Sequence, residues 1–235
     1  MSTKAILITG AQKRLGFHLA QAGLDMGYTV IIHHHKPLPE TEKMHLFQEQ
    51  FRDKVFFVQH ELSDHPEKLF DKIAAFQLEL KGLVNNASVF SEGNISDFTH
   101  FESLFRVNFE APLKLAQRFS EIVNAGWIIN ITDSNNRKFN KRFQNYRLIK
   151  LFLEELTFQQ ASLYAPDIRV NGIAPGAILP SSKTEEDFFR SLEKKIPLNM
   201  TKQIQSLTNA FKFLAESPFV TGEIIHVDGG WNLVA

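Results

Sequence analysis

The sequence predicts an α/β fold in which helices cover both faces of a mostly parallel, seven-stranded sheet. Three observations lead to this prediction. Short β-branched, apolar runs recur along the chain, and amphipathic stretches long enough for helices lie between them. A glycine-containing turn directly follows the first run. No linker rich in Pro, Gly or Ser divides the 235 residues, so we expect a single doubly wound domain over residues 1–235.

The alternation of runs and helical stretches predicts right-handed β-α-β units around the sheet. The predicted strands are AILIT (5–9), TVIIHH (29–34), KVFFVQ (54–59), GLVNN (82–86), WIINIT (127–132), IRVNGI (168–173) and EIIHVD (223–228). A helix around 98–118 carries phenylalanines near helical spacing, which predicts a stripe facing the core or another subunit; these are Phe98, Phe101, Phe105 and Phe109.

One polar, charged segment stands apart from this pattern. PSSKTEEDFFRSLEKKIPLN (180–199) precedes the last predicted helix. We expect a substrate-loop insertion at about residues 177–200, and its composition suits either a mobile lid or an ordinary surface helix.

The overall composition excludes several classes of function. Positive and negative residues balance at 26 each, so no net charge draws the chain to nucleic acid or to an anionic membrane. There is no cysteine, which excludes disulfides, thiol catalysis and cysteine-ligated metals. The N-terminus lacks the apolar length of a signal peptide, and no apolar run approaches the roughly 20 residues of a membrane span. We expect a cytoplasmic globular protein.

The segment ITGAQKRLG (8–16) follows the first predicted strand and opens a helix. Gly10 permits a tight turn, and Gly16 lets the helix approach the sheet. A helix N-terminus placed there offers free N–H groups to a pyrophosphate. Arg14 stands where a middle glycine is expected, and we interpret it as a cation near the phosphates and the substrate, in preference to a solvated helix-start residue.

The end of the second predicted strand reads HHHKP (33–37), and no acidic residue occurs before Glu40. An acid at this point would bind the ribose 2′-hydroxyl of NADH and repel a 2′-phosphate. His35 and Lys36 instead offer positive or donor groups, so the sequence predicts NADPH. Successive strand side chains point to opposite faces, so consecutive histidines do not converge on one ion and we expect no metal.

Tyr146 and Lys150 lie four residues apart and share one face of a predicted helix. A nearby ammonium favours the phenolate, so we expect Lys150 to lower the pKa of Tyr146 and make it a usable proton donor near neutral pH. Tyr-x-x-x-Lys alone occurs by chance. It becomes specific together with the N-terminal turn, NNAS (85–88), Asn108 and the Pro-Gly pair at 175–176.

These motifs resemble the short-chain dehydrogenase/reductase family, in order and over essentially the whole chain. The matching segments are TGAQKRLG, NNAS, YRLIK, RVNGIAPG (169–176) and TGEIIHVDGG (221–230). Four features resemble its pteridine reductase branch, which includes bacterial dihydromonapterin reductases. They are Arg14 in KRLG, the basic HHHK, Ser88 and Phe90 in NNASVF, and Asp133 in NITD at the usual serine position.

The resemblance implies a Rossmann-type, homotetrameric enzyme that reduces a dihydropteridine (dihydromonapterin, dihydrobiopterin or dihydrofolate-like) to its tetrahydro form with NADPH. Lys150 would bond the nicotinamide ribose, and Asn108 would support a water relay to Lys150. The implied NADPH-binding residues are Gly10, Arg14, Leu15, His35, Lys36, Glu61, Leu62, Asn86, Ala87, Ser88, Tyr146, Lys150, Pro175 and Gly176. The implied substrate-binding residues are Arg14, Ser88, Phe90, Asp133 and Tyr146.

Some positions depart from the family pattern or allow a simpler interpretation. Glu61 stands where an aspartate usually bonds adenine, Ile149 replaces a small residue before the lysine, and Pro37 lacks the hydroxyl often found beside a 2′-phosphate. Phe90 would stack a flat pterin against the nicotinamide, but it is one of 22 phenylalanines, and the sequence alone favours a place in the core.

Asp133 is the residue that most restricts the chemistry. A ketone reductase needs a hydrogen-bond donor for the developing oxyanion, which an ionised carboxylate would repel. A pterin presents N–H donors and takes a proton on nitrogen, so a carboxylate there can accept hydrogen bonds and, with a raised pKa, feed a proton to Tyr146 or to the ring. Alternatively, Asp133 caps its loop or pairs with one of the cations Arg137, Lys138, Lys141 and Arg142.

Two other functions remain open at the level of sequence. One is a short-chain reductase acting on a ketone or a 3-oxoacyl carrier substrate. The other is a catalytically silent dinucleotide-binding regulator, against which the intact set of Asn108, Tyr146 and Lys150 speaks.

Overall fold

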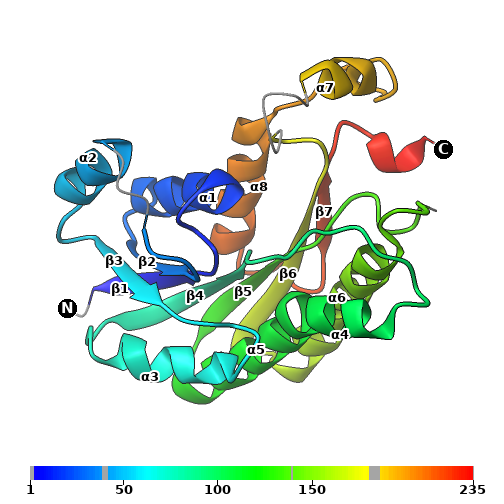
Figure 1. Cartoon of the computed structure of the whole chain (residues 1–235). Helices are drawn as coiled ribbons and strands as arrows, with labels where there is room; N and C mark the ends of the chain where they lie inside the picture. The colour runs from blue at the N-terminus through cyan, green and yellow to red at the C-terminus, as the bar shows by residue number, and fades with distance from the viewer. Residues whose placement is uncertain (1–2, 39–41, 139, 180–185, 235) are drawn as a thin grey trace.

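A seven-stranded sheet forms the centre of the molecule in the computed structural model, which describes residues 3–38, 42–138, 140–179 and 186–234. The strand order is β3-β2-β1-β4-β5-β6-β7, and every neighbouring pair is parallel. Helices cover both faces of the sheet (Figure 1). The predicted doubly wound α/β fold is therefore confirmed.

All seven predicted runs form strands. β4 begins at Glu79 instead of Gly82, because its polar first residues pair with the start of β1. The strands are β1 Lys4–Ile8, β2 Thr29–His34, β3 Val55–Gln59, β4 Glu79–Asn85, β5 Gly126–Ile131, β6 Ile168–Pro175 and β7 Ile224–Val227.

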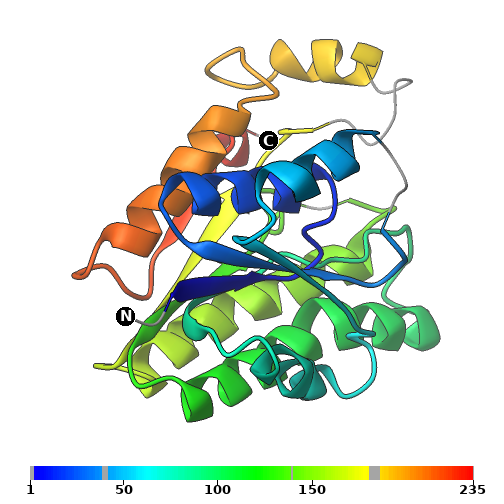
Figure 2. The same ribbon diagram turned by 90° about the vertical axis from the view of Figure 1, so that its left-hand side faces the viewer.

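The helices form one layer on each side of the sheet, as the two views at right angles show (Figures 1 and 2). One layer holds α1 (Arg14–Asp25), α2 (Glu42–Gln50) and α8 (Ile204–Glu216). The other holds the 3-10 turn η1 (Pro66–Lys68), α3 (Leu69–Ala74), α4 (Phe98–Phe105), η2 (Arg106–Glu110), α5 (Ala111–Ile122) and α6 (Gln144–Leu163). A short 3-10 helix, η4 (Trp231–Leu233), follows β7.

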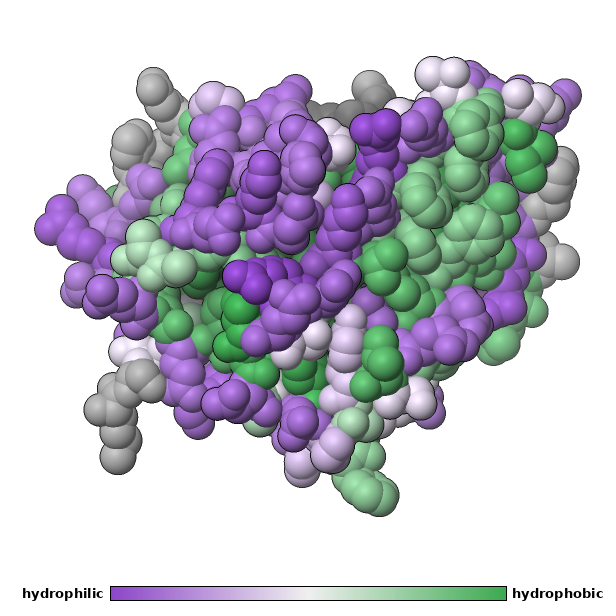
Figure 3. Space-filling view, turned by 90° about the horizontal axis from the view of Figure 1, so that it is seen from below, coloured by the Kyte–Doolittle hydropathy of each residue, from purple (hydrophilic) through white to green (hydrophobic). Residues whose placement is uncertain are grey.

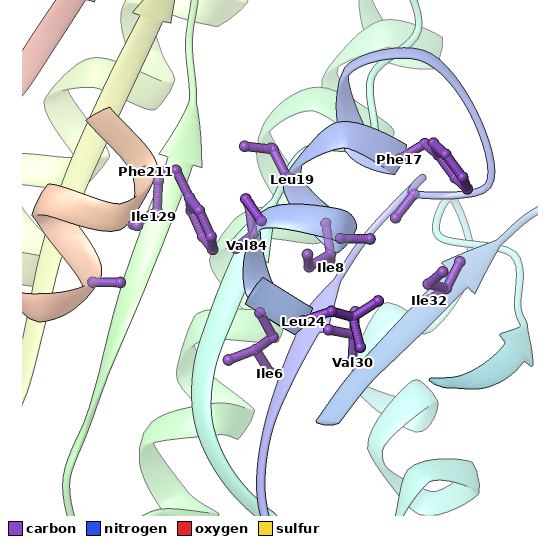
Figure 4. Close-up of a cluster of buried hydrophobic side chains, with 14 of the residues drawn as sticks. Ile6, Ile8, Phe17, Leu19, Leu24, Val30, Ile32, Val84, Ile129 and Phe211 are labelled. Carbon is purple, nitrogen blue, oxygen red and sulfur yellow. The ribbon is translucent and has the colours of Figure 1, made fainter. Parts of the chain in front are cut away.

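The sheet is buried on both faces, which explains why its strands are nearly continuous apolar runs. On the α1 and α8 side, side chains of both helices interlock with those of the central strands (Figure 4); the core there includes Ile6, Ile8, Phe17, Leu19, Val84 and Phe211. The opposite face packs a second cluster against α3, α5 and α6, including Leu7, Ile31, Leu83, Leu115 and Phe119. The site is thus carried by a rigid, well-packed scaffold.

The helix predicted around 98–118 is confirmed, because α4, η2 and α5 follow one another without a gap and keep helical backbone angles where they join. Between α4 and α5 the chain forms a π-helical segment, Arg106–Glu110, and this segment places Asn108 at 0% exposure. The phenylalanine rings form a ladder of near-stacked neighbours along the outside: Phe98, Phe101, Phe105 and Phe109. Figure 3 shows apolar side chains gathered on this underside, over the region of α4 and α6.

The predicted insertion at about 177–200 is helical in part of its described portion. α7 spans Glu186–Glu193, and it buries Phe189 and Leu192. Residues 180–185, which also belong to the predicted lid, lie outside the described residues. The surface-helix interpretation fits α7, and a lid function stays a prediction.

The strand order reverses between β1 and β4, which lie side by side at the middle of the sheet. In doubly wound sheets, ligands bind at such a reversal, outside the carboxyl ends of the strands. The loops that follow β1, β2, β4, β5 and β6 all meet at this edge, and they carry the residues considered next.

Candidate active site

A cleft of about 1280 Å³ opens at the carboxyl ends of the strands. With the exception of Asn108, every residue predicted to bind cofactor or substrate or to act in catalysis lines it. These residues are Gly10, Arg14, Leu15, His35, Lys36, Glu61, Leu62, Asn86, Ala87, Ser88, Phe90, Asp133, Tyr146, Lys150, Pro175 and Gly176. Residues far apart in the sequence thus share one large site.

The turn after β1 packs closely against the loop after β4. Gly10 has φ +63°, and a Cβ there would lie 2.9 Å from Cα of Ala87, so a larger residue is excluded by conformation and by space. The hydroxyl of Thr9 accepts the amides of Asn86 and Ala87, both at 2.9 Å. The Asn86 side chain in turn donates to the carbonyl of Thr9 at 2.8 Å.

The N-terminus of α1 faces the cleft without a side-chain cap and without an acidic residue in its first turn. The helix dipole and the amides of this turn therefore suit an anion. Arg14 adopts φ +55°, a left-handed conformation that is unusual for a non-glycine residue. Its guanidinium reaches across the cleft and donates to the carbonyl of Leu179 at 3.2 Å.

The end of β2 places His35 and Lys36 at the exposed rim of the cleft. Nδ1 of His35 lies 2.7 Å from Oε2 of Glu61. Oε1 of Glu61 accepts the amide and the hydroxyl of Ser63 at 2.9 and 2.8 Å. Burial alone would raise the pKa of Glu61, but the Ser63 hydrogen bonds and the charge of His35 outweigh it and lower that pKa. Glu61 thus holds His35, a role that the sequence did not indicate.

Asn108 is buried and does not line the cleft, but it supports residues that do. Its Oδ1 accepts the Ser88 hydroxyl at 2.8 Å and the Val89 amide at 2.9 Å, and its Nδ2 donates to the carbonyl of Val89 at 2.9 Å. Asn108 therefore fixes the loop that carries Ser88 and Phe90. The implied water relay to Lys150 stays a prediction.

Tyr146, Lys150 and Asp133 form the polar centre of the cleft. Tyr146 and Lys150 are buried on one face of α6. The Tyr146 hydroxyl donates a long hydrogen bond of 3.4 Å to Oδ2 of Asp133, which follows β5. The ammonium of Lys150 donates to the carbonyl of Ile131 at 2.8 Å and lies 5.7 Å from the centre of the Tyr146 ring.

The two oxygens of Asp133 have different partners. Oδ1 accepts the amide of Asn135 at 2.8 Å, which is a local loop cap, while Oδ2 faces Tyr146. Three of the four loop cations pair elsewhere: Arg137 with Glu154, Lys138 with the carbonyl of Trp231, and Arg142 with Glu92. Asp133 therefore serves as a loop cap through one oxygen and keeps the other in the cleft.

Burial dominates the proton affinities at this centre. It raises the pKa of Asp133, against the opposing influence of the Asn135 amide, Lys150 and Arg147. It lowers the pKa of Lys150 to about 8, which Asp133 opposes. Burial, and after it the charge of Asp133, raises the pKa of Tyr146 well above its usual range. The prediction that Lys150 lowers the pKa of Tyr146 is wrong: Tyr146 remains a neutral phenol, able to donate its proton.

Phe90 lies in the cleft wall with 62% of its surface exposed, so its interpretation as a core residue is wrong. One face of its ring stacks on Phe143, with centroids 4.4 Å apart and planes 13° from parallel. The rings of Phe90 and Tyr146 pack in a T-shaped arrangement with centroids 4.8 Å apart. An aromatic platform therefore lies beside the proton donor. Ile149, one turn along α6, is fully buried against this region.

The sequence did not single out several other residues of the cleft. Phe143, Arg147 and Trp231 also line it, as does His33, which stands out in the sequence only as one of three consecutive histidines. Of these residues, Arg147 could have been inferred from the sequence, because it directly follows Tyr146. Within the described ranges, no three His, Asp or Glu side chains group as metal ligands. Nor does any described helix combine the length and apolar character that crossing a bilayer requires.

The fold and the site together define a dinucleotide-binding oxidoreductase of the Tyr-Lys type, and comparison with known proteins agrees. A family model described as enoyl-(acyl carrier protein) reductase matches residues 10–232. The chain belongs to the short-chain dehydrogenase/reductase family.

Individual relatives differ in their activities. The chain is 29% identical to pteridine reductase 1 of Leishmania tarentolae, over 97% of this chain and 96% of that protein. It is 26% identical to glucose and ribitol dehydrogenase of Daucus carota, over 97% of this chain and 84% of that protein. Among solved structures, FolM alternative dihydrofolate reductase 1 from Brucella canis, complexed with NADP, matches with a TM-score of 0.88 and 30% identity, over 98% and 95% of the two chains.

Proposed function

We propose that this protein reduces a dihydropteridine to the tetrahydro form with NADPH. The observation that carries the proposal is the carboxylate of Asp133 facing the Tyr146 hydroxyl at the carboxyl end of β5. A ketone reductase would lose transition-state stabilisation from a negative charge at this point. A pterin ring, with its amino and N–H donors, gains hydrogen bonds from it.

The residues of the cleft suit NADPH. The uncapped N-terminus of α1 and the turn at Gly10 would hold the diphosphate. His35 and Lys36 would meet the 2′-phosphate at the rim. Lys150 would hold the nicotinamide ribose, and Pro175 and Gly176 would pass beside the nicotinamide. The similarity to a protein solved with NADP supports this assignment.

When bound, NADPH supplies the hydride, which adds to the carbon of a ring C=N bond while NADPH becomes NADP⁺. The nitrogen of that bond takes up a proton, so the dihydropteridine gains two hydrogens in total. Tyr146, kept neutral by its raised pKa, gives this proton. Asp133, ionised when the pterin binds, then takes up a proton from solvent, which its raised pKa favours, and passes it to Tyr146. Phe90 and Phe143 hold the flat ring system beside Tyr146 by aromatic contact.

Two alternatives make different demands on the same site. Reduction of a ketone or a 3-oxoacyl substrate is supported by two relatives, 3-oxoacyl-[acyl-carrier-protein] reductase of Staphylococcus aureus and glucose and ribitol dehydrogenase of Daucus carota, each 26% identical to this chain. It requires Asp133 to be protonated throughout turnover, because only then is it a donor. A silent regulator would bind NADPH without turnover, and the Tyr146–Lys150 pair would then have no use.

We further propose a cytoplasmic homotetramer, as the family resemblance implies. The ladder on α4 and η2 would supply one contact face. Phe98 is 73% exposed and Phe152 of α6 is 38% exposed, and Phe109 meets Phe152 edge-on. Sedimentation of the wild type against Phe98→Ser and Phe152→Ser variants tests this, since both variants should shift toward smaller species.

An initial-rate panel tests the proposed reaction. NADPH oxidation is followed with dihydromonapterin, dihydrobiopterin, dihydrofolate and a set of simple ketones, with NADH in parallel. We expect turnover with at least one dihydropterin at a kcat/KM above that for every ketone, and a preference for NADPH. A ketone that exceeds all pterins would favour the carbonyl alternative. Tight NADPH binding without any turnover would favour the regulator.

A further inference from the structure

His33 is a buried histidine at the cofactor end of the cleft, and none of the roles described above uses it. It is the fifth residue of β2, 1% exposed, on the same face of the strand as Ile31. The ring ends beneath the turn that follows β1 and forms part of the cleft wall beside Gly10 and Leu62. A buried ionisable side chain needs hydrogen-bond partners for its polar atoms.

Both ring nitrogens have backbone partners that fix the state of the imidazole. The amide of Gly10 donates to Nδ1 at 3.1 Å. Nε2 lies 3.0 Å from the carbonyl oxygen of His60, which can only accept. Nδ1 must therefore be unprotonated and Nε2 must carry the proton, so the ring is neutral and in a single tautomer.

The surroundings keep the ring in that state. Burial lowers the pKa of His33 to about 4. The titratable groups that face it are His34, His60 and Glu61; positive charge on either histidine further lowers this pKa, while the His60 carbonyl and Glu61 raise it. His33 is consequently a constant hydrogen-bond acceptor for the Gly10 amide across the neutral range.

The turn is thereby held from two strands. From the β4 side, the Asn86 side chain donates to the carbonyls of Thr9 and Gly10, and the Asn86 amide donates to the Thr9 hydroxyl. From the β2 side, the carbonyl of His33 accepts the amide of Ala11 at 3.1 Å, and the ring accepts the amide of Gly10. Without the ring, the amide of Gly10 would be left without a hydrogen-bond acceptor inside the protein. An unsatisfied buried amide costs more free energy than the loss of a hydrogen bond at an exposed position.

We infer that His33 is a positioning residue for the nucleotide: its imidazole fixes the Gly10 amide from β2, so that the turn at residues 10–16 presents its backbone to the cofactor diphosphate in one arrangement. The inference rests on the proposed use of NADPH. It gives His33 a function distinct from His35 and Lys36, which meet the 2′-phosphate at the rim.

Two substitutions separate the two hydrogen bonds of the ring. The side-chain oxygen of asparagine can occupy the place of Nδ1, so His33→Asn keeps an acceptor for the Gly10 amide and gives up the link to His60. The terminal amide of glutamine reaches the place of Nε2, so His33→Gln keeps the link to His60 and gives up the acceptor. His33→Leu removes both. Ile31→Val is the matched control, because it trims the core on the same face of β2 without touching the turn.

The dissociation constant for NADPH is measured by fluorescence for these proteins, together with Tm and with kcat at saturating NADPH. We expect His33→Leu and His33→Gln to raise the dissociation constant about tenfold, the scale of one buried hydrogen bond. His33→Asn and Ile31→Val should stay close to the wild type. The kcat at saturating NADPH should be unchanged in all folded variants, because Tyr146 and Lys150 stand on α6.

Equal dissociation constants for His33→Asn and His33→Gln would overturn the inference, and that comparison stands even if His33→Leu fails to fold. A dissociation constant for NADPH that is normal in His33→Gln but raised in His33→Asn would also overturn the inference. That result would show that NADPH binding depends on the hydrogen bond to the His60 carbonyl and not on the one to Gly10. A wild-type protein that binds no NADPH would overturn the proposed function and this inference together. Wild-type binding without differences among the variants would overturn the inference alone.

Discussion

Replacing Asp133 by serine converts the site to the arrangement expected for a carbonyl reductase. The substitution removes the carboxylate oxygen that lies 3.4 Å from the Tyr146 hydroxyl, and with it the charge that raises the pKa of Tyr146 after burial. Loss of an acid/base group lowers rates by about 10²-fold, which corresponds to roughly 2.7 kcal/mol in the activation free energy. We expect kcat/KM for a dihydropterin to fall by at least that factor, while reduction of a simple ketone is unchanged or improves.

The same change should stabilise the fold at neutral pH. Burial raises the pKa of Asp133, so the folded protein carries a carboxylate at a cost that serine avoids. The assay is therefore paired: NADPH oxidation with a dihydropterin and with a ketone, and Tm for each protein. Asp133→Asn is the control, because it keeps the shape and removes the charge and the exchangeable acid proton. Full pterin activity in Asp133→Ser, with the fold intact, would refute the argument from nitrogen chemistry and leave Asp133 as a loop cap.

Three further predictions concern cofactor choice, stacking and pH. Lys36→Glu should narrow or reverse the preference for NADPH over NADH, seen as the ratio of the two kcat/KM values; equal use of both cofactors by the wild type would contradict the premise. Phe90→Ala should raise KM for the pterin far more than KM for NADPH, since aromatic stacking contributes roughly 0.5–1.5 kcal/mol beyond buried area; equal losses would deny the stacking role. The free energy of unfolding should fall by up to roughly 3 kcal/mol from pH 6.5 to about 4, because unfolded His33 takes up a proton there and folded His33 does not. Chemical denaturation of His33→Asn should lack this component, and identical profiles would contradict it.

The fold could be predicted because each strand is a compact β-branched run and each connection is long enough for a helix. The π-helical segment Arg106–Glu110 within the continuous helix could not be predicted. It places Asn108 where its side chain forms hydrogen bonds with Ser88 and Val89. These residues lie 20 and 19 positions earlier in the sequence but are adjacent in space. A tertiary contact of this kind leaves no periodic signal in the segment itself.

The members of the site could be predicted to a large extent, because motifs at the carboxyl ends of parallel strands meet at one edge of the sheet. Their electrostatics could not. The expected effect of Lys150 on Tyr146 assumed an ammonium directed at the phenol. In the structure that ammonium bonds the Ile131 carbonyl, and burial together with Asp133 sets the pKa of Tyr146. The pairing of His35 with Glu61 and the place of His33 likewise depend on which strands are neighbours.

The most direct measurement of the central claim is hydride transfer from NADPH to a ring carbon of a pterin. The wild type is incubated with dihydromonapterin and NADPH deuterated at both transferable positions of the nicotinamide C4, and the product is examined by mass spectrometry. We predict a tetrahydropterin that carries one deuterium on carbon, formed by the wild type and nearly abolished in Tyr146→Phe, which should still bind NADPH. Absence of deuterated tetrahydropterin, while a ketone accepts deuterium under the same conditions, would contradict the account.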